Sequence, residues 1–331
     1  MKPMLLHRSL LRPTFMNSPN LVRCILRVSV SLMLIIGVGF EQNTAQAQAI
    51  GDGRQDLLLQ HNTGLSGAWF MDGYNQIGAA FTQPGGLNDP VDIGWRIAGT
   101  GDFNADGRPD IVWQHSEGVQ PLGWIAIWFM DGTNRLDKVN PALTGWAYTE
   151  PRQASDMLWR IKTVGDLNGD AKPDLVWEYD DGTTQWQGLW LMNGINRIEA
   201  NMFNPQLPLN SGWTVAAAAD FNADGKSDIV WQNSIGAAPT GDIAVWFMNG
   251  TNKLSSSLTS PPTGVDLGWR IKSAADFNSD NKPDLIWQHS QDWSGIWFMT
   301  STNLLNAVLS AHLRFLQRQS KERLLRRSKL G

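Results

Sequence analysis

Acidic side chains recur in this chain at a spacing that suits a hard cation. Residues 102–110 read Asp-Phe-Asn-Ala-Asp-Gly-Arg-Pro-Asp, and the same arrangement returns at 166–174, 220–228 and 276–284. Oxygen-bearing side chains occupy places 1, 3, 5 and 9 of each nine-residue loop, and the backbone carbonyl at place 7 is a further donor. Because Ca²⁺ takes about six to eight oxygen ligands of this kind, the pattern predicts about four bound Ca²⁺ ions, one per loop.

The predicted metal ligands are five residues in each loop. They are Asp102, Asn104, Asp106, Arg108 and Asp110; Asp166, Asn168, Asp170, Lys172 and Asp174; Asp220, Asn222, Asp224, Lys226 and Asp228; and Asp276, Asn278, Asp280, Lys282 and Asp284. An earlier copy ending at Asp56 has Gln48 and Ile50 at places 1 and 3, so we expect it to bind no ion. Ala171 stands at place 6, where a turn needs glycine, and we expect strain there.

The loops belong to a tandem repeat of four strand-like segments. Their last aspartates, counted from Asp56, are 54, 64, 54 and 56 residues apart. Each period holds Gly-Trp-Arg-Ile or a variant, then the loop and a strand such as 228–232, then an apolar run such as 243–248 ending in a hairpin signal, then a polar segment. Four short strands in each period indicate a β-propeller blade with the small-residue strand innermost. The expected fold is all-β, a propeller of about five four-stranded blades, the first and last incomplete.

The loop and its flanking strands together resemble the FG-GAP/VCBS repeats, the calcium-loop propeller repeats also found in integrin α-chains and some fungal lectins. The resemblance covers residues 50–303 and implies that the loop joins the first two strands of each blade. An EF-hand is excluded, because place 12 of each loop is tryptophan instead of glutamate and strands flank it. Propellers of this family usually have seven blades, whereas this chain has five repeats.

The sequence does not decide how the ring closes. The spacing places a closing strand near residues 320–328, and nothing there reads Gly-Trp-Arg-Ile. The ring is therefore open, closed poorly, or completed by another molecule through oligomerisation.

The two ends of the chain differ from the repeats. Residues 1–49 combine a basic lead, an apolar run at 28–40 and small-residue cleavage sites near Ala47 or Ala49, which is typical of a secretory signal peptide; an uncleaved membrane anchor is the alternative. Cleavage would remove Cys24, the only cysteine. Residues 304–331 are a divergent basic tail, either an amphipathic helix or a replaced terminus without a selected role. We expect a secreted protein, periplasmic or extracellular, with segments 1–49, 50–303 and 304–331.

The charge distribution argues against some partners. Between residues 50 and 312 the chain has 15 basic and 29 acidic residues, a net charge of −14, although the whole chain carries −4. An acidic body repels phosphate backbones, so no nucleic acid partner is expected. The basic tail is the one segment expected to contact a membrane.

Tryptophan usage suggests where a ligand would bind. Most of the 17 tryptophans occupy three repeated strand positions and are interpreted as packing. Trp124, Trp186 and Trp293 lie instead in or beside the link between the second and third strands of a repeat. Exposed rings on variable loops commonly grip sugars, and local packing is the alternative. We therefore expect a calcium-stabilised, lectin-like or adhesive module for carbohydrate or an extracellular protein.

Catalytic signatures do not stand out from the repeat. The histidines at 61, 115 and 289 follow glutamine at equivalent positions, so they belong to the repeat pattern. No catalytic residue is predicted, and the chain is not expected to be an enzyme. One acidic cluster, Glu178 with Asp180 and Asp181, breaks the repeat and keeps a polysaccharide-degrading enzyme as an alternative. A structural fragment of a larger propeller assembly is a third.

Overall fold

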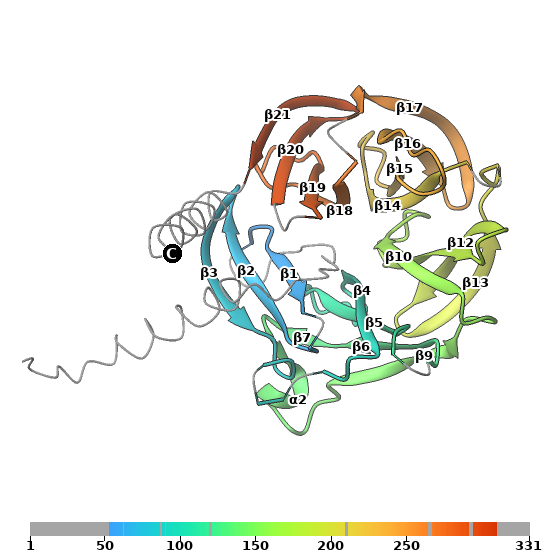
Figure 1. The fold of residues 1–331 in the computed structure, drawn as a ribbon. Helices are drawn as coiled ribbons and strands as arrows, with labels where there is room; N and C mark the ends of the chain where they lie inside the picture. Colours follow the sequence, from blue (N-terminus) through green and yellow to red (C-terminus); the bar gives the residue numbers. More distant parts are fainter. Residues whose placement is uncertain are drawn as a thin grey trace, which may run out of the picture.

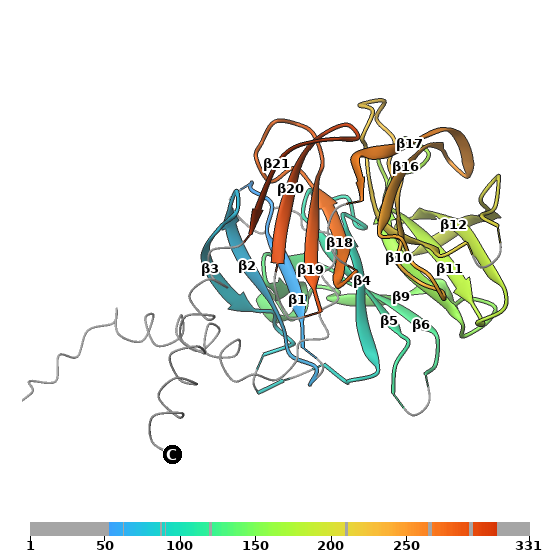
Figure 2. The same cartoon turned by 45° about the horizontal axis from the view of Figure 1, so that its top comes forward.

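The chain forms a ring of five β-sheet blades that follow one another in chain order (Figure 1). This computed structural model describes residues 53–309 except 62, 87, 90, 119–120, 209–210, 264–266 and 291–293. In the tilted view of Figure 2, the strands of each blade run next to one another. The predicted all-β propeller is therefore confirmed. The predicted signal peptide at 1–49 lies outside the described residues, and within them no helix is both long and apolar enough to cross a membrane.

The blades are antiparallel, and each runs from an inner strand to an outer one. Blade 1 has three described strands, β1 (Leu57–Gln60), β2 (Ser66–Asp72) and β3 (Asn75–Phe81). Blade 2 has β4 (Trp95–Gly101), β5 (Asp110–His115), β6 (Trp124–Trp128) and β9 (Trp146–Gln153), with the short strands β7 (Met130–Asp131) and β8 (Asn134–Arg135) and the helix α2 (Leu136–Val139). Blade 3 has β10 (Trp159–Gly165), β11 (Asp174–Asp180), β12 (Gln185–Asn193) and β13 (Asn196–Met202).

The last two blades repeat this order. Blade 4 has β14 (Trp213–Ala219), β15 (Asp228–Asn233), β16 (Asp242–Asn249) and β17 (Asn252–Thr263). Blade 5 has β18 (Trp269–Ala275), β19 (Asp284–His289), β20 (Ser294–Thr300) and β21 (Asn303–Leu309). Isolated parallel bridges between blades, such as Asn196 with Glu150, join neighbouring sheets at the rim.

The outer strand of blade 5 corrects the predicted start of the tail. The helical spacing of Leu305 and Leu309 predicts a divergent segment from residue 304, but residues 303–309 form β21 and pair with β20. The fifth blade is therefore complete, and that prediction is wrong for 304–309. The edge of β20 supplies ladder partners, and this tertiary pairing outweighs a weak local helical pattern. The rest of the predicted tail and the region 320–328 lie outside the described residues.

The inner strands carry small residues because they approach one another closely. A Cβ added at Gly99 would lie 2.3 Å from Val164 Cγ2, and one added at Gly165 would lie 2.7 Å from Ser227 Oγ. The predicted placement of the small-residue strand at the centre is confirmed. Each inner strand also has a β-bulge at the same place; the residues left out of the pairing are Ala98, Lys162, Ala216 and Lys272.

Hydrophobic clusters between neighbouring blades close the ring within one chain. The cluster between the last and first blades joins Ile286 and Phe298 of blade 5 to Leu57 and Trp69 of blade 1. Four similar clusters join the other neighbours. Blade 5 packs directly on blade 1, whereas the sequence predicted a ring that is open, closed poorly or completed by another molecule.

The repeated tryptophans pack as interpreted from the sequence. Trp113 on β5 and Trp128 on β6 have ring centroids 4.7 Å apart, and the second-strand tryptophans are fully buried. Blades 3, 4 and 5 repeat this pair at 4.7–4.8 Å.

The side chain of a glutamine on the second strand forms two hydrogen bonds with the backbone of the next blade, a contact that we call the clasp. Gln114 Nε2 donates to the carbonyl of Trp159 at 2.8 Å, and its Oε1 accepts from the N–H of Ile161 at 3.0 Å. Gln60 and Gln232 make the same two bonds to blades 2 and 5.

Glu178 takes the place of this glutamine in blade 3. Its Oε2 accepts from the N–H of Val215, and its Oε1 accepts from the Thr214 hydroxyl and lies 3.3 Å from Lys162 Nζ. A carboxylate cannot donate to a carbonyl, so the threonine and the lysine complete the clasp instead. The acidic residue that breaks the repeat thus has a structural explanation.

Removing one clasp is expected to destabilise the ring. Gln114→Ala leaves the Trp159 carbonyl and the buried Ile161 N–H without their partner, which costs about 2–4 kcal/mol. Glu178→Gln installs the residue that other blades use, and a change within about 1 kcal/mol is expected because the amide keeps an acceptor for the Val215 N–H and Lys162, which loses its ion pair, is partly exposed. Urea unfolding measures both. Equal losses in the two variants would show that the clasp is not what stabilises the interface.

Candidate metal loops and ligand-binding grooves

Each predicted metal loop joins the inner strand of its blade to the second strand, in agreement with the implied family arrangement. Two residues in every loop have a left-handed backbone. In the first loop they are Ala105 (φ 58°) and Gly107 (φ 82°). Ala171 (φ 63°) is strained as predicted, but Ala105 is comparably strained, and the fourth loop uses Ser279 and Asn281 at both positions. The sequence motif indicates that place 6 needs a left-handed backbone, but it does not indicate the same need at place 4. The sequence therefore could not rank the loops by their backbone strain.

The side chains at places 1, 3 and 5 gather on the exposed surface of the loop. In the first loop the N–H of Asp106 donates to Asp102 Oδ1 at 3.1 Å and to Asn104 Oδ1 at 3.0 Å, and Asn104 Nδ2 donates to Asp106 Oδ2. The third and fourth loops repeat this network. Hard oxygens close together on an exposed loop are donors that Ca²⁺ accepts.

The aspartate at place 9 is buried and holds the blade together. Asp110 Oδ1 accepts from the N–H of Met130 on β7, and Oδ2 accepts from the N–H of Phe103, both at 3.0 Å. The equivalent aspartates of blades 3, 4 and 5 make the same pair of bonds. Asp56 of the first copy still holds Met71 at 2.8 Å. We call this contact the aspartate staple; it gives Asp56 a structural role in a copy that has Gln48 and Ile50 at places 1 and 3.

Burial raises the pKa of the staple carboxylates. For Asp110 burial raises the pKa to about 7 and the carboxylates of Asp106 and Asp102 act in the same direction, whereas the N–H groups of Met130 and Phe103 lower it. The same causes raise the pKa of Asp174 to about 7 and of Asp228 and Asp284 to about 6. A cation nearby would favour the charged form of these groups.

The nine places of a loop do not suit a cation equally well. Within the described ranges no three Asp, Glu, His or Cys side chains are gathered as a metal site requires. Places 1, 3 and 5 suit Ca²⁺ in type and exposure. At place 9 both carboxylate oxygens already accept backbone N–H groups, so only their remaining lone pairs are available. Calcium binding stays a prediction.

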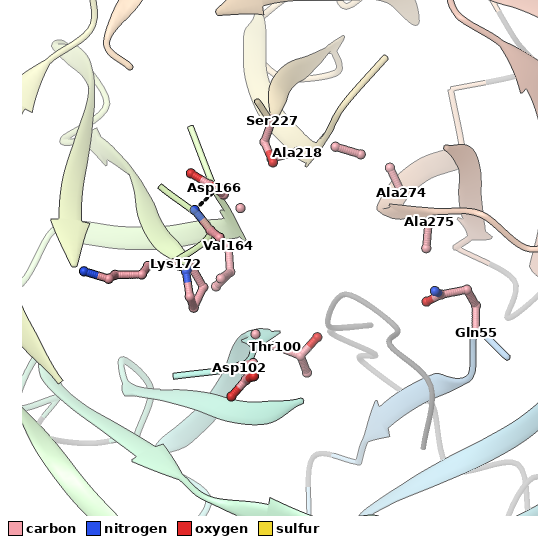
Figure 3. Close-up of a pocket in the computed structure, with 15 residues that line it drawn as sticks. Gln55, Thr100, Asp102, Val164, Asp166, Lys172, Ala218, Ser227, Ala274 and Ala275 are labelled. Atoms are coloured by element: carbon pink, nitrogen blue, oxygen red, sulfur yellow. Dashed lines mark hydrogen bonds between the residues drawn. The ribbon is translucent and has the colours of Figure 1, made fainter. Parts of the chain in front are cut away.

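A cavity of about 380 Å³ opens at the loop end of the ring axis (Figure 3). Residues from all five blades line it, including Gln55 of blade 1 and Ala274 of blade 5. Asp102 and Asp166, the first residues of two metal loops, lie at this opening with Lys172. The loops of neighbouring blades therefore meet around one end of the axis.

The three predicted ligand-binding tryptophans do not form one surface. Trp124 lies at the start of β6 and packs edge-on against Tyr148 at 5.6 Å, with the Arg152 guanidinium 4.1 Å from the Tyr148 ring and 5.1 Å from the Trp124 ring. Trp186 lies on β12, opposite Tyr179, and is 41% exposed. Trp293 lies outside the described residues.

A groove between blades 1 and 2 holds a cluster of aromatic residues that the three predicted tryptophan positions do not include. We call it the aromatic groove, a cavity of about 380 Å³ lined by Trp95, Trp128, Trp146, Tyr148 and Arg135 together with Asp89 and Lys138. Trp146 is 42% exposed and meets Tyr148 edge-on at 5.1 Å. Arg135 lies 4.9 Å over the Trp128 ring and donates twice to Asp137, which lowers the pKa of that carboxyl.

The groove is larger than the equivalent cavity of the next blade. The equivalent cavity between blades 2 and 3 has about 170 Å³ and is lined by Trp159, Trp190 and Arg197. Blade 2 has a longer connection before its outer strand, which contains α2, and the strand itself supplies Trp146 and Tyr148. The sequence carried this signal, because the second repeat spans 64 residues where its neighbours span 54 and 54.

The acidic cluster of blade 3 is dispersed in the structure. Glu178 is buried in the clasp, whereas Asp181 lies in an exposed turn. The hydroxyl and N–H of Thr183, with the N–H of Thr184, lower the pKa of Asp181 to about 2. Glu178 therefore contributes to the clasp, and Asp181 accepts hydrogen bonds that stabilise its own turn.

Comparison with known proteins identifies the repeat. A family model described as an FG-GAP-like repeat matches residues 102–177 and 166–231. Three solved structures are similar to the chain at low sequence identity. The Dos1 propeller has 10% identity and a TM-score of 0.35 over 81% of this chain and 74% of that one. Raptor from Chaetomium thermophilum has 12% identity and a TM-score of 0.39, over 83% of this chain and 22% of that one. A chain of the mitotic checkpoint complex has 11% identity and a TM-score of 0.37, over 82% of this chain and 81% of that one. No curated protein sequence matches the chain.

Proposed function

Because the chain carries FG-GAP-like β-propeller repeats, we propose that it is an exported, calcium-stabilised binding module whose ligand is a carbohydrate. It acts as a scaffold and has no catalytic role. The basic and apolar pattern of residues 1–49 supports export. Millimolar Ca²⁺ outside the cell also suits exposed loops, because extracellular calcium modules bind with Kd of about 0.1–1 mM.

In this proposal four loops hold one Ca²⁺ each. In the first loop Asp102, Asn104 and Asp106 supply side-chain oxygens, Arg108 supplies its carbonyl, and Asp110 adds charge from beneath. The ion supplies charge neutralisation in an acidic loop cluster. The residues themselves position the inner strand against the rest of the blade.

The aromatic groove is the observation that supports a carbohydrate ligand. Sugar rings present apolar C–H faces to aromatic side chains and hydroxyls to polar groups, and the groove offers both in a concave site. Trp146 provides an exposed ring, while Arg135, Lys138 and Asp89 provide hydrogen-bonding groups at its side. An extracellular protein would be expected to use a broader and flatter surface than this groove.

Glycan-array binding by the full chain tests the proposal. Trp146→Ala is expected to lower binding at least tenfold, because it removes the exposed ring of the groove. Trp186→Ala removes an equally exposed ring from blade 3 and serves as the comparison. If Trp186→Ala lost glycan binding and Trp146→Ala retained it, the ligand would lie on blade 3. If the unmodified chain bound no glycan, the carbohydrate assignment would be refuted.

A further inference from the structure

The end of the ring axis opposite the metal loops has its own cavity. The four inner strands β4, β10, β14 and β18 run from one end to the other. Their last residues, such as Ala218 and Ala275, line the cavity of Figure 3. Their first residues, such as Ile97 and Val215, line a second cavity of about 250 Å³, which we call the basic mouth.

We propose that the basic mouth binds a small oxyanion, a phosphate or sulfate group that is either free or carried on a small ligand. Four cations line it, Arg96 from β4, Arg160 and Lys162 from β10, and Lys272 from β18. Among the described residues that line it, Glu117 is the one carboxylate. Glu178 lies 3.3 Å from Lys162 but is itself held in the clasp.

The backbone places these side chains at the axis through the repeated bulge. Lys162 and Lys272 are the residues left out of the pairing in blades 3 and 5. Bulges commonly redirect side chains at binding sites. Blades 2 and 4 have Ala98 and Ala216 at the same place, and both also line the cavity. At the bulge position, blades 3 and 5 therefore supply charge, and blades 2 and 4 supply space.

The arginines are held in place without a carboxylate partner. Arg96 Nη1 donates to the carbonyls of Ile93 and Trp95, at 2.8 and 3.1 Å. Arg160 donates from Nη1 to the carbonyls of Met157 and Trp159 and from Nη2 to that of Ser116. Within the described part of the chain neither guanidinium forms an ion pair. In Arg96, Nε and Nη2 keep N–H donors that no described residue accepts.

These features select the chemistry of the ligand. A guanidinium that is fixed on one side presents a rigid fork, which matches the geometry of an oxyanion. The cavity has room for such a group with its waters and is small for an oligosaccharide. The surrounding chain is acidic, with a net charge of −14 between residues 50 and 312, whereas four cations and one carboxylate line this mouth. The site is independent of the proposed carbohydrate function.

Isothermal titration calorimetry of the full chain with inorganic phosphate, at constant ionic strength, tests the site. Saturable binding is expected, and Arg96→Ser and Arg160→Ser should each weaken it at least fivefold. Arg160→Lys keeps the charge but loses the fork, so an intermediate loss is expected. Arg197→Ser removes the same charge from the outer strand β13 and should leave the affinity within twofold.

Two further arms make the outcome decisive. Sulfate should compete with phosphate for the site. The affinity for glucose 6-phosphate shows whether the natural ligand is a free ion or carries the phosphate on a sugar. An affinity equal to that for phosphate indicates a free ion, and tighter binding indicates an anionic sugar. Among the described residues, Arg96 bonds to the carbonyls of Ile93 and Trp95 on its own segment, so Arg96→Ser remains a test if Arg160→Ser does not fold. No saturable heat, or unchanged affinity in Arg96→Ser, would overturn the proposal.

Discussion

Asp110→Ala is expected to destabilise the protein by about 3–5 kcal/mol even when Ca²⁺ is absent. The substitution leaves the buried N–H groups of Met130 and Phe103 without their acceptor, and each such group costs about 1–3 kcal/mol. Both bonds measure 3.0 Å in the structure and Asp110 has no exposed surface. Urea unfolding in a chelating buffer measures the loss.

Asp106→Ala in the same loop separates the two roles of the motif. Asp106 is exposed, and its contacts lie within the loop. Its removal should therefore cost less than about 1 kcal/mol in chelator. With Ca²⁺ present, Asp106→Ala should lose the stabilisation contributed by one ion. If Asp110→Ala were harmless in chelator, the staple would not contribute to stability and place 9 would serve only as a metal ligand.

Removal of Ca²⁺ is expected to lower the stability as strongly as loss of a staple. A site that binds only the folded state contributes about 0.4–1.4 kcal/mol when the free ion is roughly one to ten times its Kd, which is the range that millimolar Ca²⁺ reaches. Four such sites add to about 2–6 kcal/mol, which for a chain of this size lowers the Tm by about 4–12 °C. Differential scanning calorimetry in millimolar Ca²⁺ and in chelator measures the difference.

A matched pair of variants assigns that effect to the loops. Asp106→Asn and Asp224→Asn together should remove about half of the Ca²⁺-dependent shift, because two of four loops lose a carboxylate. Glu199→Gln removes one exposed charge from β13 and should leave the shift unchanged. Equal shifts in all variants would indicate that Ca²⁺ acts at other places.

The sequence predicted what is local or periodic. The nine-residue phrase and its return identify the loops, and the Gly/Ala-rich segments identify the inner strands, because only small residues tolerate the approach seen at Gly99 and Gly165. The tryptophan positions repeat with the strands and pack as expected.

What the sequence could not show depends on contacts between distant residues. Asp110 has the residue type of a metal ligand, and only the fold reveals that Met130, twenty residues away, occupies one of its oxygens. The pairing of β21 with β20 outweighs its helical spacing. Trp146 and Trp95 come from different repeat positions, and only the folded arrangement of β4 and β9 in blade 2 brings them to one groove.

Counting the calcium ions on the metal-free protein tests the central proposal most directly. Equilibrium dialysis with metal analysis should find about four Ca²⁺ per chain at millimolar concentration, and about three in Asp106→Ala. The ions should bind in the same concentration range in which the Tm rises. A chain that takes up no Ca²⁺ at that concentration, with a melting curve unchanged by chelator, would contradict calcium stabilisation of this propeller.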